Sequence, residues 1–167
     1  MLLKLLESED DDSTNRTKPV LPDLSGNIFF GNSLLNPTQT DKKNHAELNP
    51  FDFSTLHFDV IVGNPPYIKS EDMKNITPLE LPLYKTNYTS AYKQFDKYFL
   101  FIEQGLNLLN GDGVLGYIVP SKYAKVGAGK KLRELIVENE YLSSIVSFGA
   151  NQVFADKTTY NLFAHSE

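Results

Sequence analysis

Four consecutive residues, 64–67, combine an amide, two rigid prolines and an aromatic ring: Asn64-Pro65-Pro66-Tyr67. They directly follow the apolar run 58–63, whose composition is typical of a strand covered on both faces. Ligand sites of open α/β sheets lie just beyond the carboxyl ends of the strands. The position and the residue types together predict a site that acts on a planar amino group.

The chemistry of such a site follows from the weak nucleophilicity of an exocyclic amino nitrogen, whose lone pair is delocalised into the ring. The side-chain oxygen of Asn64 can accept one amino hydrogen and the carbonyl of Pro65 the other, which aims the lone pair at an electrophile. Pro65 and Pro66 restrict the backbone and hold both acceptors in place. Tyr67 offers a flat face for a base, and stacking of this kind contributes about 1–3 kcal/mol.

A base in a duplex must be flipped out of the stack before it can reach this site. The residues predicted to be catalytic are therefore Asn64, Pro65, Pro66 and Tyr67, and Tyr67 is also expected to bind the substrate. The alternative is a turn that merely ends the strand, because Asn and Pro are common turn residues. The position directly after an apolar strand favours the catalytic interpretation.

Composition indicates one soluble globular domain with an ordinary core. The chain has 167 residues, of which 41% are hydrophobic and 22% charged, and it contains no cysteine. No apolar stretch is long enough to cross a bilayer, so we expect a cytoplasmic protein without a membrane partner. The histidines (His45, His57 and His165) lack ligand spacing, and we expect no metal site.

The charge is unevenly distributed. The formal net charge is -5, and five acids lie within residues 7–12, so the remainder has 16 acidic and 16 basic residues. We interpret residues 1–26 as a linker or frayed N-terminal segment and residues 27–167 as the folded domain. Overall acidity argues against non-specific binding of nucleic acid by the whole surface. Five basic residues between 122 and 133 could contact phosphate or could form a solvated helix start, and both interpretations stay open.

Helices alternate with strands along the domain, which predicts an α/β sheet with parallel strands. The expected strands are residues 27–30, 58–62, 114–119, 142–148 and 159–163. The expected helices are residues 91–109, with Ser90 as N-cap, and 129–139. Residues 71–89 are expected to be irregular because Pro78 and Pro82 interrupt them.

Several segments resemble the N6-adenine-specific DNA methyltransferases of restriction-modification systems, most closely the fused type IIG enzymes. The sequence FDVIVGNPPY (58–67) is similar to their catalytic motif and FFGNSLL (29–35) to a preceding cofactor motif. The sequence GVLGYIVPS (113–121) is similar to a later strand of the family, and KKLRELI (130–136) to its next helix. Val153-Phe154 resembles a segment that places a second aromatic ring against the flipped adenine.

The resemblance implies a Rossmann-like class I fold and S-adenosylmethionine as cofactor. It implies that Asn32 and Asn64 contact the cofactor and that Phe154 stacks opposite Tyr67. The implied substrate is an adenine flipped out of double-stranded DNA. A specificity or nuclease module, or the remainder of the same polypeptide, is the implied protein partner.

The N-terminal residues depart from the family pattern. The glycine-rich cofactor loop should precede residue 27, but Gly26 is the only glycine in that part of the chain. We therefore expect a partial Rossmann-like fold that lacks its first strands, an incomplete cofactor pocket and no methyltransferase activity of this chain alone. The strand 58–62 would then present an apolar edge, which invites self-association or pairing with another chain.

Two other functions stay open. Methyltransferases that act on a glutamine of translation release factors also use Asn-Pro-Pro-Tyr, because a glutamine amide poses the same problem of nucleophilicity. They are not expected to carry the later IVPS and Val-Phe segments. A non-catalytic remnant that serves as a structural or interaction module is the other alternative.

Overall fold

The computed structural model of the protein describes residues 26–147 and the backbone of residues 159–165. Residues 31–167 belong to one compact unit, and residues up to Phe30 belong to another. The sequence analysis placed this boundary between residues 26 and 27. Phe154 lies outside the described residues, as do the acidic run and most of the predicted N-terminal segment.

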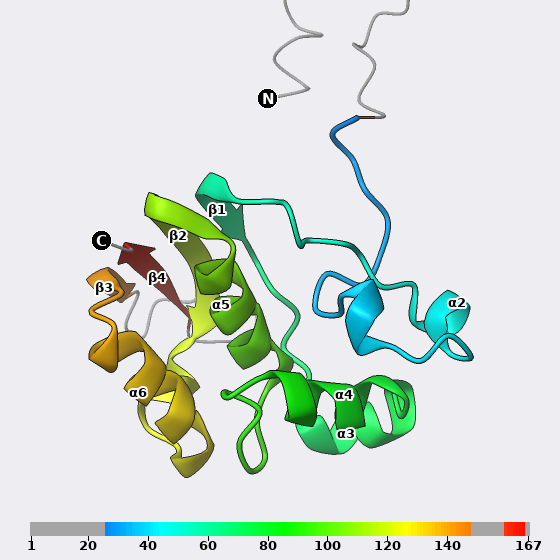
Figure 1. Cartoon of the computed structure of the whole chain (residues 1–167). Helices are drawn as coiled ribbons and strands as arrows, with labels where there is room; N and C mark the ends of the chain where they lie inside the picture. Colours follow the sequence, from blue (N-terminus) through cyan, green and yellow to red (C-terminus); the bar gives the residue numbers. More distant parts are fainter. Residues whose placement is uncertain (1–25, 148–158, 166–167) are drawn as a thin grey trace, which may run out of the picture. The chain divides into compact units, whose positions relative to one another are not determined.

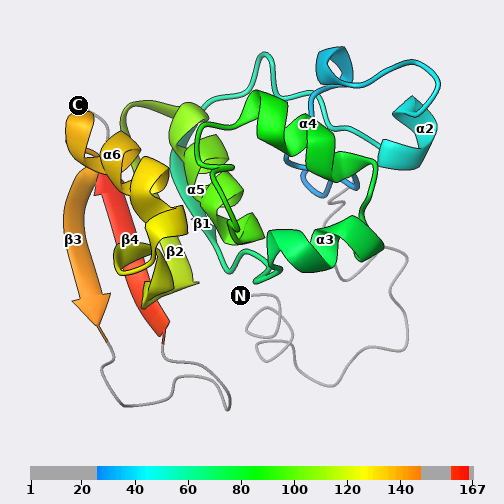
Figure 2. The same ribbon diagram turned by 90° about the horizontal axis from the view of Figure 1, so that it is seen from below.

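A four-stranded sheet forms the centre of the unit (Figure 1). Its strands are β1 (Phe58–Gly63), β2 (Leu109–Pro120), β3 (Leu142–Ser147) and β4 (Thr159–His165). The spatial order is β1-β2-β4-β3, so the last strand in sequence lies between β2 and β3 (Figure 2). β1 pairs in parallel with β2, whereas β4 is antiparallel to both of its neighbours.

The prediction of parallel strands is therefore correct for β1 and β2 and wrong for β4. Parallel neighbours need a crossover connection, which is usually a helix. Helices precede β2 and β3 in the chain, so β1, β2 and β3 all run in one direction. No helix was predicted between β3 and β4, and the reversed direction of β4 is consistent with that pattern.

The strand predicted at residues 27–30 is absent. Residues 28–30 have no regular secondary structure, and Ile28, Phe29 and Phe30 are exposed. The nearest backbone pairing after this segment is an isolated parallel bridge between Asn32 and Pro50. A short apolar segment becomes a strand only when a partner strand satisfies its backbone, and the described residues supply none here.

The described helices are α2 (His45–Leu48), α3 (Ser70–Ile76), α4 (Glu80–Asn87), α5 (Lys97–Asn107) and α6 (Lys130–Glu138). The prediction that residues 71–89 are irregular is wrong. Pro78 follows the end of α3, and Pro82 lies in the first turn of α4, where the missing N–H has no helical partner to lose. The two prolines therefore delimit helices rather than prevent them.

Helix α5 begins six residues later than predicted, at Lys97, with Asp96 rather than Ser90 as N-cap. The backbone N–H groups of Thr89 and Ser90 donate to the carboxylate of Glu103, at 2.9 and 2.7 Å. Glu103 is itself buried in α5. The segment before α5 thus folds back onto the helix instead of extending it.

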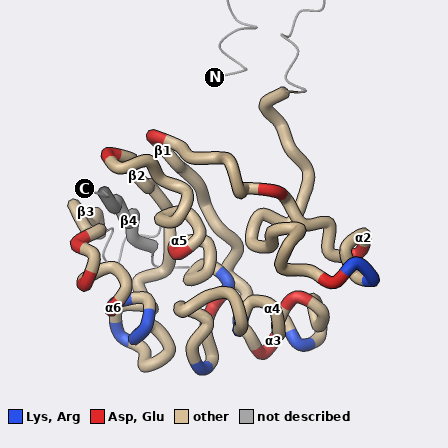
Figure 3. The backbone as a smooth tube through the Cα atoms, in the orientation of Figure 1, with Lys and Arg blue, Asp and Glu red and all other residues tan. Residues whose placement is uncertain are grey.

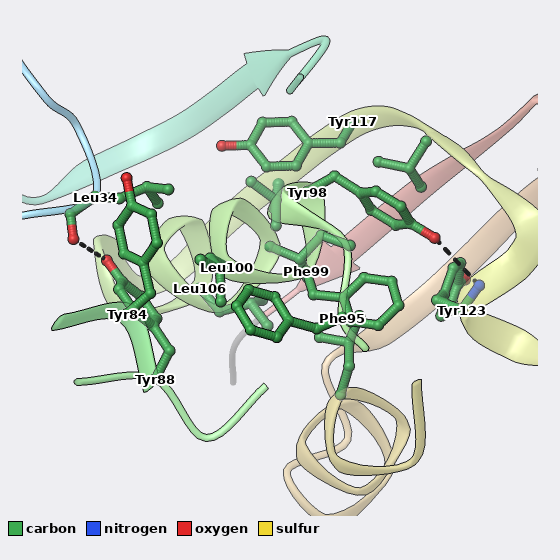
Figure 4. Close-up of a cluster of buried hydrophobic side chains, with 14 of the residues drawn as sticks. Leu34, Tyr84, Tyr88, Phe95, Tyr98, Phe99, Leu100, Leu106, Tyr117 and Tyr123 are labelled. Carbon is green, nitrogen blue, oxygen red and sulfur yellow. Dashed lines mark hydrogen bonds between the residues drawn. The ribbon is translucent and has the colours of Figure 1, made fainter. Parts of the chain in front are cut away.

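The core lies between α5 and the sheet. As predicted, the aromatic and aliphatic stripe is internal, with Phe95, Phe99, Ile102 and Leu106 buried. The helix approaches β2 so closely that a Cβ on Gly105 would lie 2.7 Å from a methyl group of Leu115, which explains the glycine. Figure 4 shows the aromatic side chains of this core.

Buried tyrosines bind backbone groups within the core. Tyr88 Oη donates to Leu34 O at 2.7 Å, and Tyr123 N donates to Tyr98 Oη at 3.2 Å (Figure 4). Burial raises the pKa of Tyr84, Tyr88 and Tyr98 well above the usual range, and it raises the pKa of Tyr117 to about 12. These phenols stay protonated in the folded chain when an unfolded chain would already have lost the protons.

We expect the protein to lose stability in alkali, and Tyr117→Phe should reduce that loss. A phenol with a pKa of 10 when unfolded and about 12 when folded contributes stability below pH 10 that disappears as the pH rises through 12. For Tyr117 alone the loss is about 2–3 kcal/mol. Urea unfolding followed by circular dichroism at pH 8, 10, 11 and 12 measures it. Equal alkaline losses in the two proteins would contradict the assignment.

Candidate functional site at the end of β1

The predicted catalytic residues lie directly beyond the carboxyl end of β1, which ends at Gly63. Residues 64–68 have no regular secondary structure, and no peptide bond in the described chain is cis. Asn64 and Pro66 are exposed, whereas Pro65 is buried and Tyr67 is half-buried. The alternation anchors the segment through Pro65 and leaves the amide of Asn64 open to a ligand.

Tyr67 links this segment to the neighbouring strand. Its Oη atom lies 2.6 Å from Asn64 Oδ1 and 2.7 Å from Ile118 O, near the end of β2. Burial raises the pKa of the phenol, so the hydroxyl stays protonated and can donate at neutral pH. The Tyr67 hydroxyl thereby holds Asn64 and Ile118 together at one end of the parallel strand pair.

The Tyr67 ring packs against Tyr98 and also lines a groove. The ring contacts Tyr98 edge to face, with centroids 5.8 Å apart and planes at 86°. A groove of about 340 Å³ is lined by Tyr67, Ile68 and three residues of α3: Asp72, Asn75 and Ile76. The groove thus borders the segment that carries Asn64, although Asn64 is not among its lining residues.

The chain after Tyr67 is tied to the start of α5. Lys97 N donates to Ile68 O and Ser70 N to Phe95 O, each at 2.8 Å, and Lys69 forms an antiparallel bridge with Asp96. Asp96 is 7% exposed, and its carboxylate lies 3.5 Å from Lys122 Nζ. Asp96 occupies the N-cap position of α5, but its side chain makes no capping hydrogen bond.

Asn32 makes hydrogen bonds within the chain. Its Oδ1 accepts from Leu34 N at 3.0 Å, and its Nδ2 donates to Glu80 Oε1 at 3.1 Å. Tyr84 Oη lies 3.5 Å from the same nitrogen. An amide oxygen has two lone pairs, so one remains to accept an amino hydrogen from a bound adenine. The predicted cofactor contact of Asn32 stays a prediction.

A cavity of about 380 Å³ lies against β1. Apolar side chains dominate its walls, among them Phe53, Phe58, Val62 and Phe101, and Ser33 and Gln104 are polar. Such walls suit a purine ring. None of the lining residues is charged, so they lack partners for the carboxylate and ammonium groups of S-adenosylmethionine. The lining of this cavity therefore fits the adenine end of that cofactor and not its amino-acid end.

The basic residues between 122 and 133 are largely engaged within the chain. Lys122 lies 3.5 Å from Asp96, and Lys130 and Lys131 lie 3.5 and 2.8 Å from Glu134. The guanidinium of Arg133 donates to the carbonyls of Tyr123 and Val126. These pairs favour the solvated helix start over a phosphate contact.

Within residues 26–147, whose side chains the structure describes, no three His, Asp or Glu side chains are grouped as metal ligands. No helix in this part has the length and apolar character needed to traverse a bilayer.

Comparison with known proteins supports the resemblance drawn from the motifs. The profile of the Eco57I restriction-modification methylase family matches residues 1–154. The chain is 53% identical over 170 residues to the type II restriction enzyme and methyltransferase RM.Eco57I of Escherichia coli, covering 100% of this chain and 17% of that protein. It is 35% identical over 104 residues to the type II methyltransferase M.BstVI of Geobacillus stearothermophilus, covering 62% of this chain and 18% of the relative.

The fold agrees with this result. A crystal structure from Listeria monocytogenes, assigned to the class I S-adenosylmethionine-dependent methyltransferases, matches with a TM-score of 0.55 and 19% identity. It covers 70% of this chain and 34% of that one, which confirms the predicted class I fold. The chain spans less than a fifth of the length of the two curated relatives. The protein belongs to the Eco57I restriction-modification methylase family.

Proposed function

We propose that this chain forms the substrate side of an adenine-specific DNA methyltransferase, acting in the cytoplasm on double-stranded DNA. The methyl group would come from S-adenosylmethionine and go to the exocyclic amino group of a flipped adenine. The observation that carries the proposal is the exposed amide of Asn64 at the end of β1, 2.6 Å from a phenol that is tied to β2.

The proton balance at Tyr67 supports a free acceptor on Asn64. A phenol has one proton, yet Oη lies within hydrogen-bond distance of two oxygens, Asn64 Oδ1 and Ile118 O. Both contacts are satisfied when Tyr67 donates to Ile118 O and the Asn64 amide turns so that Nδ2 donates to Tyr67. Asn64 Oδ1 then points away from the phenol and is available to an amino hydrogen of the substrate.

The remaining roles follow from the same segment. The Pro65 carbonyl accepts the second amino hydrogen, and Pro66 limits the backbone so that both acceptors keep their positions. Tyr67 stacks on one face of the adenine, on the side of the groove, and Phe154 stacks on the opposite face. Asn32 accepts a hydrogen bond from the adenine of the cofactor, and Asn64 lies where the cofactor and the substrate meet.

The substrate class separates this proposal from its two alternatives. Both relatives described above are type II methyltransferases, and the family is one of restriction-modification methylases, which favours DNA over a release factor. Methylation of adenine gives N6-methyladenine, whereas the glutamine enzyme leaves DNA unmodified. A non-catalytic remnant gives neither product.

Strand β1 is the edge of the described sheet and has an apolar surface. Val60 and Val62 are 63% and 76% exposed, and the cavity of about 380 Å³ lies beside them. An uncovered edge of this kind offers unpaired backbone groups to another strand. We propose that a strand of a longer polypeptide, which could carry a specificity or nuclease module, pairs with β1 and completes the cofactor pocket. Alternatively, the same edge of β1 pairs with a second copy of this chain.

Asn64→Ala should reduce methyl transfer by about 10²–10³-fold, because it removes one acceptor that stabilises the reacting amino group. Asn64→Asp is the matched control, since it keeps an oxygen at the same place and should retain more activity than the alanine variant. Both variants should fold normally because Asn64 is exposed. The test uses a chimaera in which this chain replaces the matching segment of RM.Eco57I. Mass spectrometry of digested DNA identifies and counts N6-methyladenine, and wild-type rates in Asn64→Ala would refute the assigned role.

Tyr67→Phe should keep the stacking face but lose the connection between Asn64 and Ile118. We expect the free energy of unfolding to fall by about 0.5–1.5 kcal/mol, because the hydrogen bond to Ile118 O is lost. Methyl transfer in the same chimaera should fall further than this small destabilisation explains, since Asn64 is no longer oriented. Urea unfolding and the adenine assay measure the two effects, and unchanged activity would show that the phenol does not position Asn64.

Val62→Lys should weaken any concentration-dependent association of the 167-residue chain. A lysine on an edge strand opposes pairing with a second edge through charge and hydration. Val137→Lys on α6 is the matched control, because Val137 is 69% exposed and lies away from β1. Sedimentation velocity over a range of concentrations compares the three proteins. If both substitutions act alike, association does not use the β1 edge.

A further inference from the structure

Three lysines from different segments line one cavity of about 280 Å³. Lys74 comes from α3, Lys85 from α4, and Lys93 from the segment before α5, and the cavity also includes Ser70, Glu71 and Gln94. All three lysines are exposed, and with Glu71 the lining carries a formal charge of +2. Figure 3 shows basic segments around α3 and α4 as well as on α6.

These lysines differ from the basic residues near α6 in having no counter-ion among the described residues. Within the described residues, no carboxylate lies within 4.0 Å of the ammonium groups of Lys74, Lys85 or Lys93. Near α6, by contrast, Lys122, Lys130 and Lys131 each face an acid. In a chain with a net charge of -5, this cavity is a local concentration of uncompensated positive charge.

The backbone at Lys93 is held in an unfavourable conformation. Its φ is 54°, in the left-handed region that a lysine rarely adopts. The segment is fixed on both sides, because Glu103 accepts from Thr89 N and Ser90 N and Phe95 O accepts from Ser70 N. The ammonium group also lies 5.2 Å from the centre of the Tyr92 ring. Strain of this kind persists where surrounding contacts impose it and is common at ligand-binding loops.

Helix α3 connects this cavity to the groove beside Tyr67. Asp72, Asn75 and Ile76 share one face, as residues three and four apart do, and line the groove. Glu71 and Lys74 lie on the adjacent face and line the lysine cavity. Ser70, which also lines that cavity, follows Tyr67 by three residues and so lies within about 11 Å of it along the backbone.

We propose that the lysine cavity binds a backbone phosphate of the DNA strand that carries the target base. The inference rests on the proposed function, because it places the base next to Tyr67. Successive phosphates of one strand are about 3.4 Å apart along the helix axis, so the cavity lies within about three nucleotides of the base. The phosphate contact fixes the strand while the base occupies the groove, and it carries no sequence information.

The first test measures DNA affinity of the 167-residue chain by fluorescence anisotropy with a labelled duplex at several salt concentrations. The variant Lys74→Gln/Lys85→Gln/Lys93→Gln should bind more weakly, with the slope of log K against log[salt] reduced by about 0.9 for one lost phosphate contact. The control Lys42→Gln/Lys43→Gln/Lys125→Gln makes the same change in net charge at exposed sites outside the cavity. An equal loss in the control would overturn the proposal, because affinity would then follow net charge alone.

The second test detects the anion directly by titrating inorganic phosphate into ¹⁵N-labelled chain. The amide signals of Lys74, Lys85 and Lys93 should shift together, and the triple variant should lose the response. Wild-type affinity and salt slope in the triple variant would overturn the site but leave the proposed function, which Asn64→Ala tests by methyl transfer. Phosphate shifts without any binding of DNA would overturn the assignment to DNA.

Discussion

The packing of α5 against β2 is the interaction on which the rest of the described fold depends. Gly105 has no side chain at the point where the helix meets Leu115, so the helix can approach the strand closely. This contact buries the aromatic stripe of α5 and places the end of β2 beside the end of β1. The burial of apolar area supplies the main favourable free energy, and the polar interactions organise what surrounds it.

The same helix organises the site through its polar positions. Glu103, buried in α5, accepts the backbone N–H groups of Thr89 and Ser90. Asp96, the residue before α5, forms a backbone β-bridge with Lys69, which fixes the chain that leaves Tyr67. Tyr98 supplies the ring against which Tyr67 packs. Residues 64–67 are therefore held by contacts with the core helix α5 and with Ile118 of β2.

Sequence patterns identified the parts of this fold that depend on local or periodic signals. The apolar run of β1 and the stripe of α5 were both placed correctly, and residues 64–67 follow the end of β1 as expected. The start of α5 was misplaced because a buried carboxylate, 13 residues away from Ser90, captures the backbone that would otherwise continue the helix. The helices α3 and α4 were missed because we read Pro78 and Pro82 as helix breakers. Pro78 instead lies between the two helices, and Pro82 lies in the first turn of α4. The lysine cavity unites three segments, and no spacing in the sequence relates Lys74, Lys85 and Lys93.

The strand order also determines when the sheet can be completed during synthesis. β4 is the last of the described strands to leave the ribosome, yet it lies between β2 and β3, which do not pair with each other. Until residues 159–165 are available, β2 has β1 as its single neighbour and β3 has none among the described strands. The long-range pairings of β4 add loop-closure entropy to the folding barrier. Nascent chains that end before β4 thus leave the inner edge of β2 and both edges of β3 without a described partner, and such unpaired edges promote aggregation.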